Sequence, residues 1–247
     1  MISRFFCPDP LIFGATVELP AEVAHHAVNV LKVGAGDTAI LFDGRGGEWQ
    51  ATLSPAGKSS KPVLYATLTE FYERDNESPL HITLVQALPA SDKMDWVVQK
   101  AVELGVARIQ PIMTQRSVMR LSGERAARRL THWRHIAIAA CEQSGRNRVP
   151  DVAPIIELPR FLGQAAENAA ELRFICAPGA TQSLRERQAP ALPIILLIGP
   201  EGGFDESELS AATTAGFQPI RLGPRVLRTE TAGVASLAAI MALWGDL

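Results

Sequence analysis

The chain has 247 residues, of which 47% are hydrophobic and 20% are charged, enough for one large folded domain or two smaller ones. Its formal net charge of -2 argues against broad, nonspecific binding to nucleic acid. Three widely separated cysteines without CxxC or His-rich spacing indicate neither a disulfide framework nor a metal site. The sequence shows neither a signal-peptide pattern nor an apolar run near the ~20 residues of a membrane span, so we expect a cytoplasmic protein outside the membrane.

The first seventy or so residues are expected to form short strands joined by tight turns. The strands are predicted at 4–6, 15–19, 38–42, 48–53 and 63–72, with one helix at 21–32. Asp43-Gly44 is a strong hairpin signal, and a small β-barrel is the natural closure of such strands. The charged, turn-rich segment 73–79 (ERDNESP) is the expected boundary, which divides the chain into domains 1–73 and 74–247.

Beyond this boundary, strands and helices alternate. An apolar strand at 81–87 precedes a helix that Gly105 ends, and the next strand is predicted at 108–113, which makes a βαβ unit. Further strands at 172–177, 194–198 and 219–222 and a final helix at 231–244 continue the pattern. The second domain is therefore predicted to be a largely parallel α/β sheet with helices on both faces.

Positive charge is concentrated in one part of the second domain. Between Arg108 and Arg148, nine arginines stand against two acidic residues, which is a local basic footprint. Several of these arginines belong to one predicted helix and are expected on its solvated face. Four others flank that helix in loops, where contacts with RNA phosphates are expected: Arg116, Arg120, Arg146 and Arg148.

Two segments near the C-terminus each run from an apolar strand into a glycine-bearing loop. They read IILLIGPEGGF at 194–204 and LGPRVLRTET at 222–231. Glycine lacks Cβ, so these loops let a planar ligand such as a nucleoside lie against the backbone. Neither contains the GxGxxG or GxxxxGK[ST] spacing of phosphate-cradling loops. Asp205 and Glu208 predict a capping box that opens a helix after the first loop.

These two loops together resemble the paired signature of the ribosomal RNA small subunit methyltransferase E family, in the SPOUT class of knotted RNA methyltransferases. The resemblance extends to QKAVELG at 99–105, RSV at 116–118 and IAACEQSGRNRVP at 138–150, and covers most of the chain. It implies a SPOUT-type knotted domain preceded by a PUA-like RNA-binding β-barrel. It also implies S-adenosylmethionine as cofactor and a homodimer built partly on the last helix.

The resemblance further implies that the enzyme methylates N3 of a uridine in 16S ribosomal RNA, as naked RNA or in the assembled small subunit. By motif match, the residues expected around the cofactor are Leu197, Ile198, Gly199, Gly202, Gly203, Leu222, Gly223, Leu227 and Thr229. In the first domain, Lys32 is a candidate RNA contact, at a position where relatives often carry Arg.

Uridine N3 must lose its proton before it is methylated, and the negative charge then spreads over the flanking carbonyl oxygens. Arg228 follows the second loop, and its permanently charged guanidinium suits the stabilisation of that anion. Glu230 is a candidate base or an orienting partner for Arg228, and its alternative role is to stabilise the start of the last helix. The rival functions are a noncatalytic RNA-binding protein of the same fold and a nucleotide-binding oxidoreductase, which the absence of GxGxxG disfavours.

Overall fold

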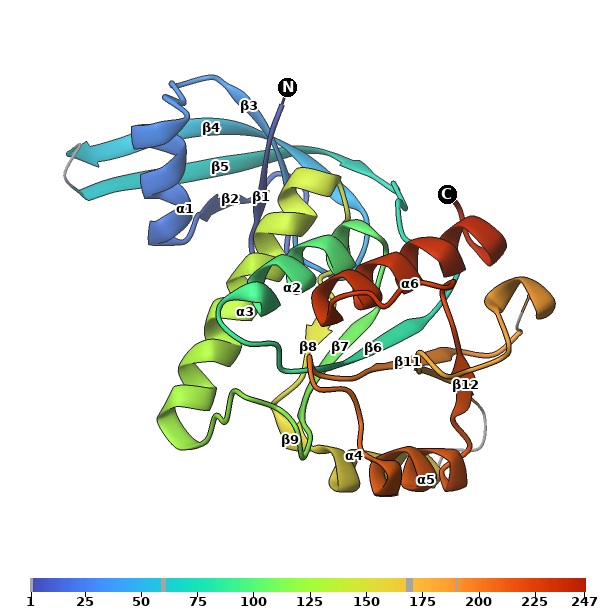
Figure 1. The fold of residues 1–247 in the computed structure, drawn as a ribbon. Helices are drawn as coiled ribbons and strands as arrows, with labels where there is room; N and C mark the ends of the chain where they lie inside the picture. Colours follow the sequence, from blue (N-terminus) through green and yellow to red (C-terminus); the bar gives the residue numbers. More distant parts are fainter. Residues whose placement is uncertain (1, 59–60, 168–170, 190) are drawn as a thin grey trace. The chain divides into compact units, whose positions relative to one another are not determined.

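The computed structural model describes residues 2–58, 61–167, 171–189 and 191–247 (Figure 1). The chain forms two compact units. The first unit contains residues 1–77 and 141–149, and the second contains 78–140 and 150–247. The predicted boundary segment 73–79 therefore spans the first junction, whereas residues 141–149, which we assigned by sequence to the second domain, pack with the first.

A five-stranded sheet with strand order β1-β3-β4-β5-β2 forms the first unit. Its elements are β1 (Ser3–Phe6), β2 (Thr16–Glu18), α1 (Ala21–His25) continued by a π-helical turn (His26–Val30), β3 (Thr38–Phe42), β4 (Glu48–Lys58) and β5 (Lys61–Tyr72). In β5, Leu64, Ala66 and Leu68 alternate with more exposed residues and enter the core, as expected for a sheet buried on one face. In the described pairings, β1 and β2 are the two edge strands and do not pair with each other. The strand order is therefore that of an open sheet, whereas a closed barrel was predicted.

The second unit is a parallel seven-stranded sheet covered by helices on both faces. Strands β12-β10-β11-β6-β7-β8 follow one another across the sheet, and β9 also pairs with β7. The strands are β6 (Ile82–Ala87), β7 (Arg108–Met113), β8 (Asp151–Val152), β9 (Ile156–Glu157), β10 (Leu172–Cys176), β11 (Ile194–Ile198) and β12 (Gln218–Ile220). The predicted parallel α/β architecture is confirmed.

The helices of the second unit lie in two layers (Figure 1). Helices α2 (Lys93–Glu103) and α6 (Thr229–Trp244) pack together on one face, and α4 (Leu158–Ala166) and α5 (Glu206–Thr214) pack together on the other. Helix α3 (Gly123–Ser144) begins in this unit, and its last residues belong to the first unit. A 3-10 turn (Leu184–Glu186) follows β10. Within the described ranges, no helix combines the length and apolar character needed to cross a membrane.

Sequence reasoning missed β8, β9 and α4. Two-residue strands have no periodicity to detect, whereas α4 carried a usable signal, because Pro159 stands in its first turn and Leu158, Phe161, Leu162 and Ala165 are buried at helical spacing. This helix covers the core cluster that contains Leu197 of β11.

The partly buried carboxylate of Glu77 holds residues 146–148 in the first unit. Oε2 of Glu77 accepts hydrogen bonds from Nε and Nη2 of Arg146 at 2.9 and 2.6 Å, and Oε1 accepts from the backbone N–H groups of Asn147 and Arg148 at 3.1 and 3.0 Å. The side chain of Arg146 is only 6% exposed. Arg146 was predicted to contact phosphate, and the structure corrects this assignment, because its guanidinium is buried against Glu77.

We expect Glu77→Ala to lower the free energy of unfolding by about 3–5 kcal/mol, because it removes the carboxylate that pairs with the buried charge of Arg146. Denaturant titration measures this loss. Glu124→Ala is the matched control, since the Glu124–Arg128 pair is 84% and 80% exposed and its removal should cost less than about 1 kcal/mol. Similar losses in the two variants would contradict the structural role of the buried pair.

Candidate functional site

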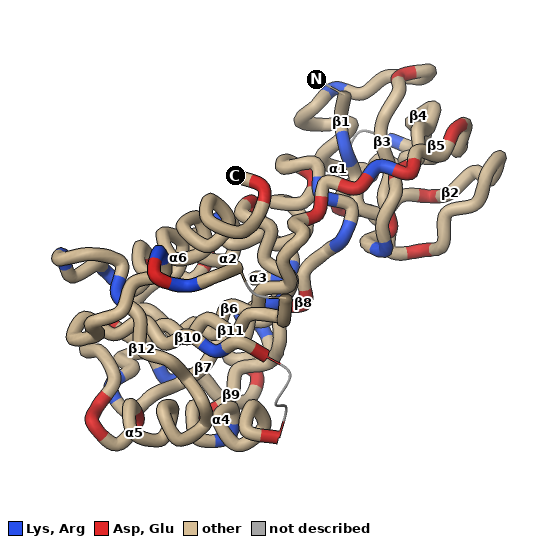
Figure 2. The backbone as a smooth tube through the Cα atoms, turned by 90° about the vertical axis from the view of Figure 1, so that its right-hand side faces the viewer, with Lys and Arg blue, Asp and Glu red and all other residues tan. Residues whose placement is uncertain are grey.

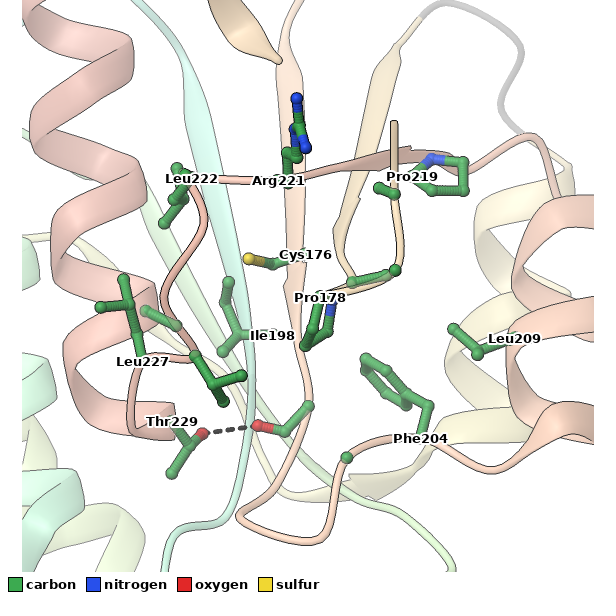
Figure 3. Close-up of a pocket in the computed structure, with 18 of the residues that line it drawn as sticks. Cys176, Pro178, Ile198, Phe204, Leu209, Pro219, Arg221, Leu222, Leu227 and Thr229 are labelled. Atoms are coloured by element: carbon green, nitrogen blue, oxygen red, sulfur yellow. Dashed lines mark hydrogen bonds between the residues drawn. The ribbon is translucent and has the colours of Figure 1, made fainter. Parts of the chain in front are cut away.

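A pocket of about 810 Å³ lies in the second unit, at the carboxyl ends of β10, β11 and β12 (Figure 3). Most of its lining comes from three segments: 176–182 after β10, residues of 198–204 after β11, and residues of 219–229 between β12 and α6. Parallel strands bring their carboxyl ends to the same edge of a sheet, where ligand sites of α/β proteins form. The sheet therefore gathers three loops that are far apart in the sequence.

The first glycine loop needs its glycines for two different reasons. A Cβ on Gly199 would lie 2.9 Å from the ring of Phe204, so the missing side chain lets that ring pack against the strand end. Gly203 has φ +69°, a conformation that side chains disfavour, and no atom lies within 4 Å of the place where its Cβ would stand. The backbone at Gly203 is therefore open to a ligand on the pocket side.

The outer side of this loop is fixed by Glu208. The predicted capping box is confirmed: Asp205 Oδ1 accepts from the Glu208 N–H at 2.7 Å, and Glu208 Oε2 accepts from the Asp205 N–H at 3.0 Å. The second oxygen of Glu208 accepts from the Gln115 N–H at 2.8 Å, and Nη1 of Arg116 donates to the Gly202 carbonyl at 3.0 Å. Two hydrogen bonds thus connect the turn after β7 to the first glycine loop and to the helix cap that follows it.

A buried hydrogen-bond chain connects the two glycine loops. The Thr229 hydroxyl donates to the Gly199 carbonyl at 2.5 Å, as the dashed line in Figure 3 shows, and accepts from Nε2 of Gln86 at 2.9 Å. Gln86 is fully buried at the end of β6, and Thr229 is the first residue of α6. These hydrogen bonds set the spacing between the first loop and the start of α6, where the second loop ends.

Several charged residues line the pocket. Arg221, Arg225 and Arg228 line it and are exposed, and the guanidinium of Arg228 has no hydrogen bond or ion pair to any described residue. Glu230 Oε1 lies 3.2 Å from Nζ of Lys93. Glu230 therefore pairs with Lys93 and does not orient Arg228. Glu230 lies in the first turn of α6, where its negative charge stabilises the helix dipole.

Most of the residues predicted around the ligand do line the pocket. These are Ile198, Gly199, Gly203, Leu222, Gly223, Leu227 and Thr229, together with Arg228. Two do not. The side chain of Leu197 is fully buried in the core cluster on the α4 and α5 side, and Gly202 faces the side chain of Arg116.

The segment 176–182 is the part of the pocket that sequence reasoning missed. Its sequence, CAPGATQ, follows the apolar strand β10 and contains Pro178 and Gly179. This is the same strand-to-loop signature that identified the other two loops, so the signal was present.

Cys176 is the first residue of this segment. Burial raises the pKa of its thiol, and a hydrogen bond from Ser236 acts in the opposite direction. The thiol is therefore protonated at neutral pH and is no activated nucleophile.

The remaining predicted RNA contacts are exposed and are distributed over the two units. Arg116 and Arg120 lie in the second unit, and Lys32 and Arg148 lie in the first. Figure 2 shows Lys and Arg positions spread over both units. Arg120 is engaged by the Gln115 carbonyl at 3.1 Å and by Glu157 at 3.7 Å, but its side chain is 51% exposed. Within the described residues, no cluster of His, Cys, Asp and Glu could hold a metal ion.

Comparison with known proteins identifies the family. Residues 76–241 match the RNA methyltransferase domain, and residues 19–61 match the RNA methyltransferase PUA domain. The ribosomal RNA small subunit methyltransferase E of Buchnera aphidicola subsp. Schizaphis graminum is 38% identical to this chain, and the match covers 100% of this chain and 98% of that protein. The chain belongs to the ribosomal RNA small subunit methyltransferase E family. The family resemblance inferred from the two loops is confirmed.

Further similar proteins match over nearly the whole of this chain. The Synechocystis sp. ribosomal RNA small subunit methyltransferase E is 35% identical over 98% of this chain and 78% of its own. The crystal structure of the Neisseria gonorrhoeae ribosomal RNA small subunit methyltransferase E, bound to S-adenosyl methionine, is 40% identical with a TM-score of 0.91, covering 100% of both chains. A putative methyltransferase from Legionella pneumophila, in complex with the bound cofactor SAM, is 36% identical with a TM-score of 0.94 and the same coverage.

We expect the contribution of Asp205 to stability to depend on pH. Hydrogen bonds from the Glu208 N–H and the Ser207 hydroxyl lower the pKa of Asp205. Its cap is therefore fully stabilising above the ordinary Asp pKa of about 3.9, and this stabilisation is lost as the pH falls through the lowered value.

The measurement is the difference in melting temperature between the wild type and Asp205→Ala, which should be largest near neutral pH and shrink toward pH 3. Asp205→Asn keeps an acceptor oxygen without a charge, so its difference from Asp205→Ala should not change with pH. A gap between wild type and Asp205→Ala that is constant over this range would contradict the ionised cap.

Proposed function

We propose that this protein transfers the methyl group of S-adenosylmethionine to N3 of a uridine in the 16S ribosomal RNA of the small subunit. The observation that carries the proposal is the 810 Å³ pocket, built on two glycine loops in a chain that aligns end to end with relatives solved with this cofactor. Its volume lies in the range of ligand pockets, and its walls are largely apolar. We propose the cytoplasm as its location, since ribosomal RNA is its substrate.

The residues present fit this cofactor. Gly203 and Gly223 have φ of +69° and +128°, and open space surrounds the positions where their Cβ atoms would stand, so a planar nucleoside can approach the backbone at both. The side chains of Ile198, Leu222 and Leu227 provide apolar walls between them. When bound, the cofactor supplies an electrophilic methyl group on a sulfonium ion.

Arg228 is the residue we assign to the chemical step. Loss of the N3 proton places negative charge on the uracil carbonyl oxygens, and a guanidinium offers forked donors to such an anion. Arg228 lines the pocket, is exposed, and has no acidic partner among the described residues that would neutralise it. Glu230 keeps Lys93 beside the start of α6 and is not assigned as the base.

We assign RNA binding to the exposed cations Arg116, Arg120, Arg148 and Lys32. In this assignment, residues 1–73 form a PUA-like RNA-binding domain and residues 74–247 form the methyltransferase domain, with a C-terminal SPOUT knot, except that residues 141–149 pack with the first unit. The partner is 16S ribosomal RNA or the small subunit.

We also propose a homodimer that uses the α2 and α6 layer. These two helices pack together, and each presents a large apolar side chain that is 43% exposed, Trp96 and Leu243. Light scattering at micromolar concentration tests the dimer, and a monomeric mass would contradict it.

Mass-spectrometric mapping of 16S ribosomal RNA tests the main proposal. Incubation of unmethylated small subunits with the protein and S-adenosylmethionine should produce one N3-methyluridine, and a parallel incubation with naked RNA identifies the preferred substrate. RNA binding without any methyl transfer to either substrate would instead favour a noncatalytic RNA-binding protein.

We expect Gly223→Val to weaken S-adenosylmethionine binding at least tenfold, because a β-branched residue disfavours φ +128° and the second loop must rearrange. Calorimetry measures the affinity. Gly14→Val is the matched control: Gly14 also has positive φ and open space around it, but it lies in the first unit. Unchanged affinity in a folded Gly223→Val variant would remove this loop from the site.

We expect Arg228→Ala to lower kcat by ~100-fold, since loss of one preorganised donor costs on the order of 3 kcal/mol. S-adenosylmethionine affinity should stay nearly intact, Arg228→Lys should rescue activity in part, and raised pH should help the alanine variant most, because more uridine is then already deprotonated. Single-turnover methylation across pH measures these effects, with Arg128→Ala on α3 as control. A variant that loses only cofactor affinity would overturn the catalytic assignment.

A further inference from the structure

Arg45 and Arg148 are paired across an antiparallel bridge within the first unit. The Gly46 N–H donates to the Asn147 carbonyl at 3.2 Å, beside the bridge. In this hydrogen-bond pattern the two bridged residues do not bond to each other, and their Cα atoms are about 4.5 Å apart. Two arginines that are distant in the sequence are thereby held side by side.

The backbone around the pair is rigid. Glu77 accepts from the N–H groups of Asn147 and Arg148, and Asn147 is fully buried, with its Oδ1 accepting from Arg4 at 2.6 Å. A Cβ on Gly46 would lie 2.9 Å from Nη2 of Arg148, so glycine at this position allows the guanidinium to lie flat against the loop. The side chain of Arg146 is buried against Glu77, whereas Arg148 is exposed.

Little negative charge balances the pair. No described residue forms an ion pair with Arg148, and Arg45 has only Asp43, with Nε and Oδ2 at 3.6 Å and the arginine side chain 64% exposed. The nearby carboxylates of Glu48 and Glu77 are occupied by Arg4, Arg74 and Arg146. Like charges directly opposite each other in an antiparallel pair are destabilising, so this arrangement is unfavourable until an anion lies between them.

We propose that Arg45 and Arg148 form a clamp for one phosphodiester group of RNA. Two neighbouring guanidiniums offer more donors than a phosphate can accept, and forked donors match its geometry. The inference rests on the proposed function for the identity of the RNA, and it adds Arg45 and a defined stoichiometry, two arginines to one phosphate. Phosphate contacts of this kind position a protein on RNA without reading its sequence.

The test compares Arg45→Gln, Arg148→Gln and the double variant, which keep most of the side-chain volume and remove the charge. Filter binding to purified 16S ribosomal RNA is measured over a range of salt concentrations. Each phosphate neutralised contributes roughly 0.7–0.9 to the slope of log K against log salt. Since both arginines serve one phosphate, the double variant should lower the slope by about one such unit, and each single variant, which keeps one arginine on that phosphate, should lower it by less. Arg128→Gln, in an exposed pair with Glu124, is the control and should leave the slope unchanged.

A double variant that loses two units would show separate phosphate contacts, and unchanged slopes would show no phosphate contact; both outcomes overturn the clamp. Inorganic phosphate is a second probe, independent of RNA. At low ionic strength it should raise the melting temperature of the wild type relative to chloride, and it should not do so for the double variant. Equal phosphate stabilisation in both proteins would contradict the proposal. If the wild type methylates 16S ribosomal RNA while the clamp fails these tests, the proposed function stands without it.

Discussion

The hydroxyl group of Thr229 joins the first glycine loop of the pocket to β6 and to the start of α6. It accepts from Gln86 and donates to the Gly199 carbonyl, so one buried atom joins β6, the first glycine loop and the start of α6. Such a chain is costly to break in a water-excluded interior, because each group would be left without a partner. Gly233 makes room for the side chain of Gln86, since a Cβ at this position would lie 2.6 Å from Oε1 of Gln86.

Two carboxylates, one in each unit, hold the backbone at or beside an exposed arginine: Glu208 is buried and Glu77 is partly buried. Glu208 accepts from the Gln115 N–H, next to Arg116, and Glu77 accepts from the N–H groups of Asn147 and Arg148. In both cases the acid bonds to the backbone, and the arginine side chain stays at the surface. The backbone beneath Arg116 and Arg148 is therefore preorganised, which reduces the entropy lost when a flexible side chain binds an anion.

This arrangement explains how a chain of net charge -2 can bind RNA. Four of the acids that contribute to the overall charge, Glu48, Glu77, Asp205 and Glu208, are engaged in ion pairs or in a helix cap. Over distances longer than about 10 Å, salt screens their field, so the local excess of arginine decides what the surface binds. Salt dependence is consequently a more informative property of this protein than its isoelectric point.

Features with a local cause were predictable from the sequence. The buried strand β11, the capping box at Asp205 and the end of α2 near Gly105 depend on neighbouring residues, and all are present. The family could also be inferred, because its two glycine loops are contiguous motifs.

Tertiary structure decided which side chains face the ligand and which charges pair. Leu197 and Ile198 are adjacent apolar residues, yet only Ile198 lines the pocket, because successive side chains of a strand point to opposite faces and α4 covers one of them. Likewise, Arg146 is buried by Glu77, and Arg45 lies beside Arg148. Burial and charge pairing depend on contacts between distant segments, and no local pattern of residues encodes those contacts.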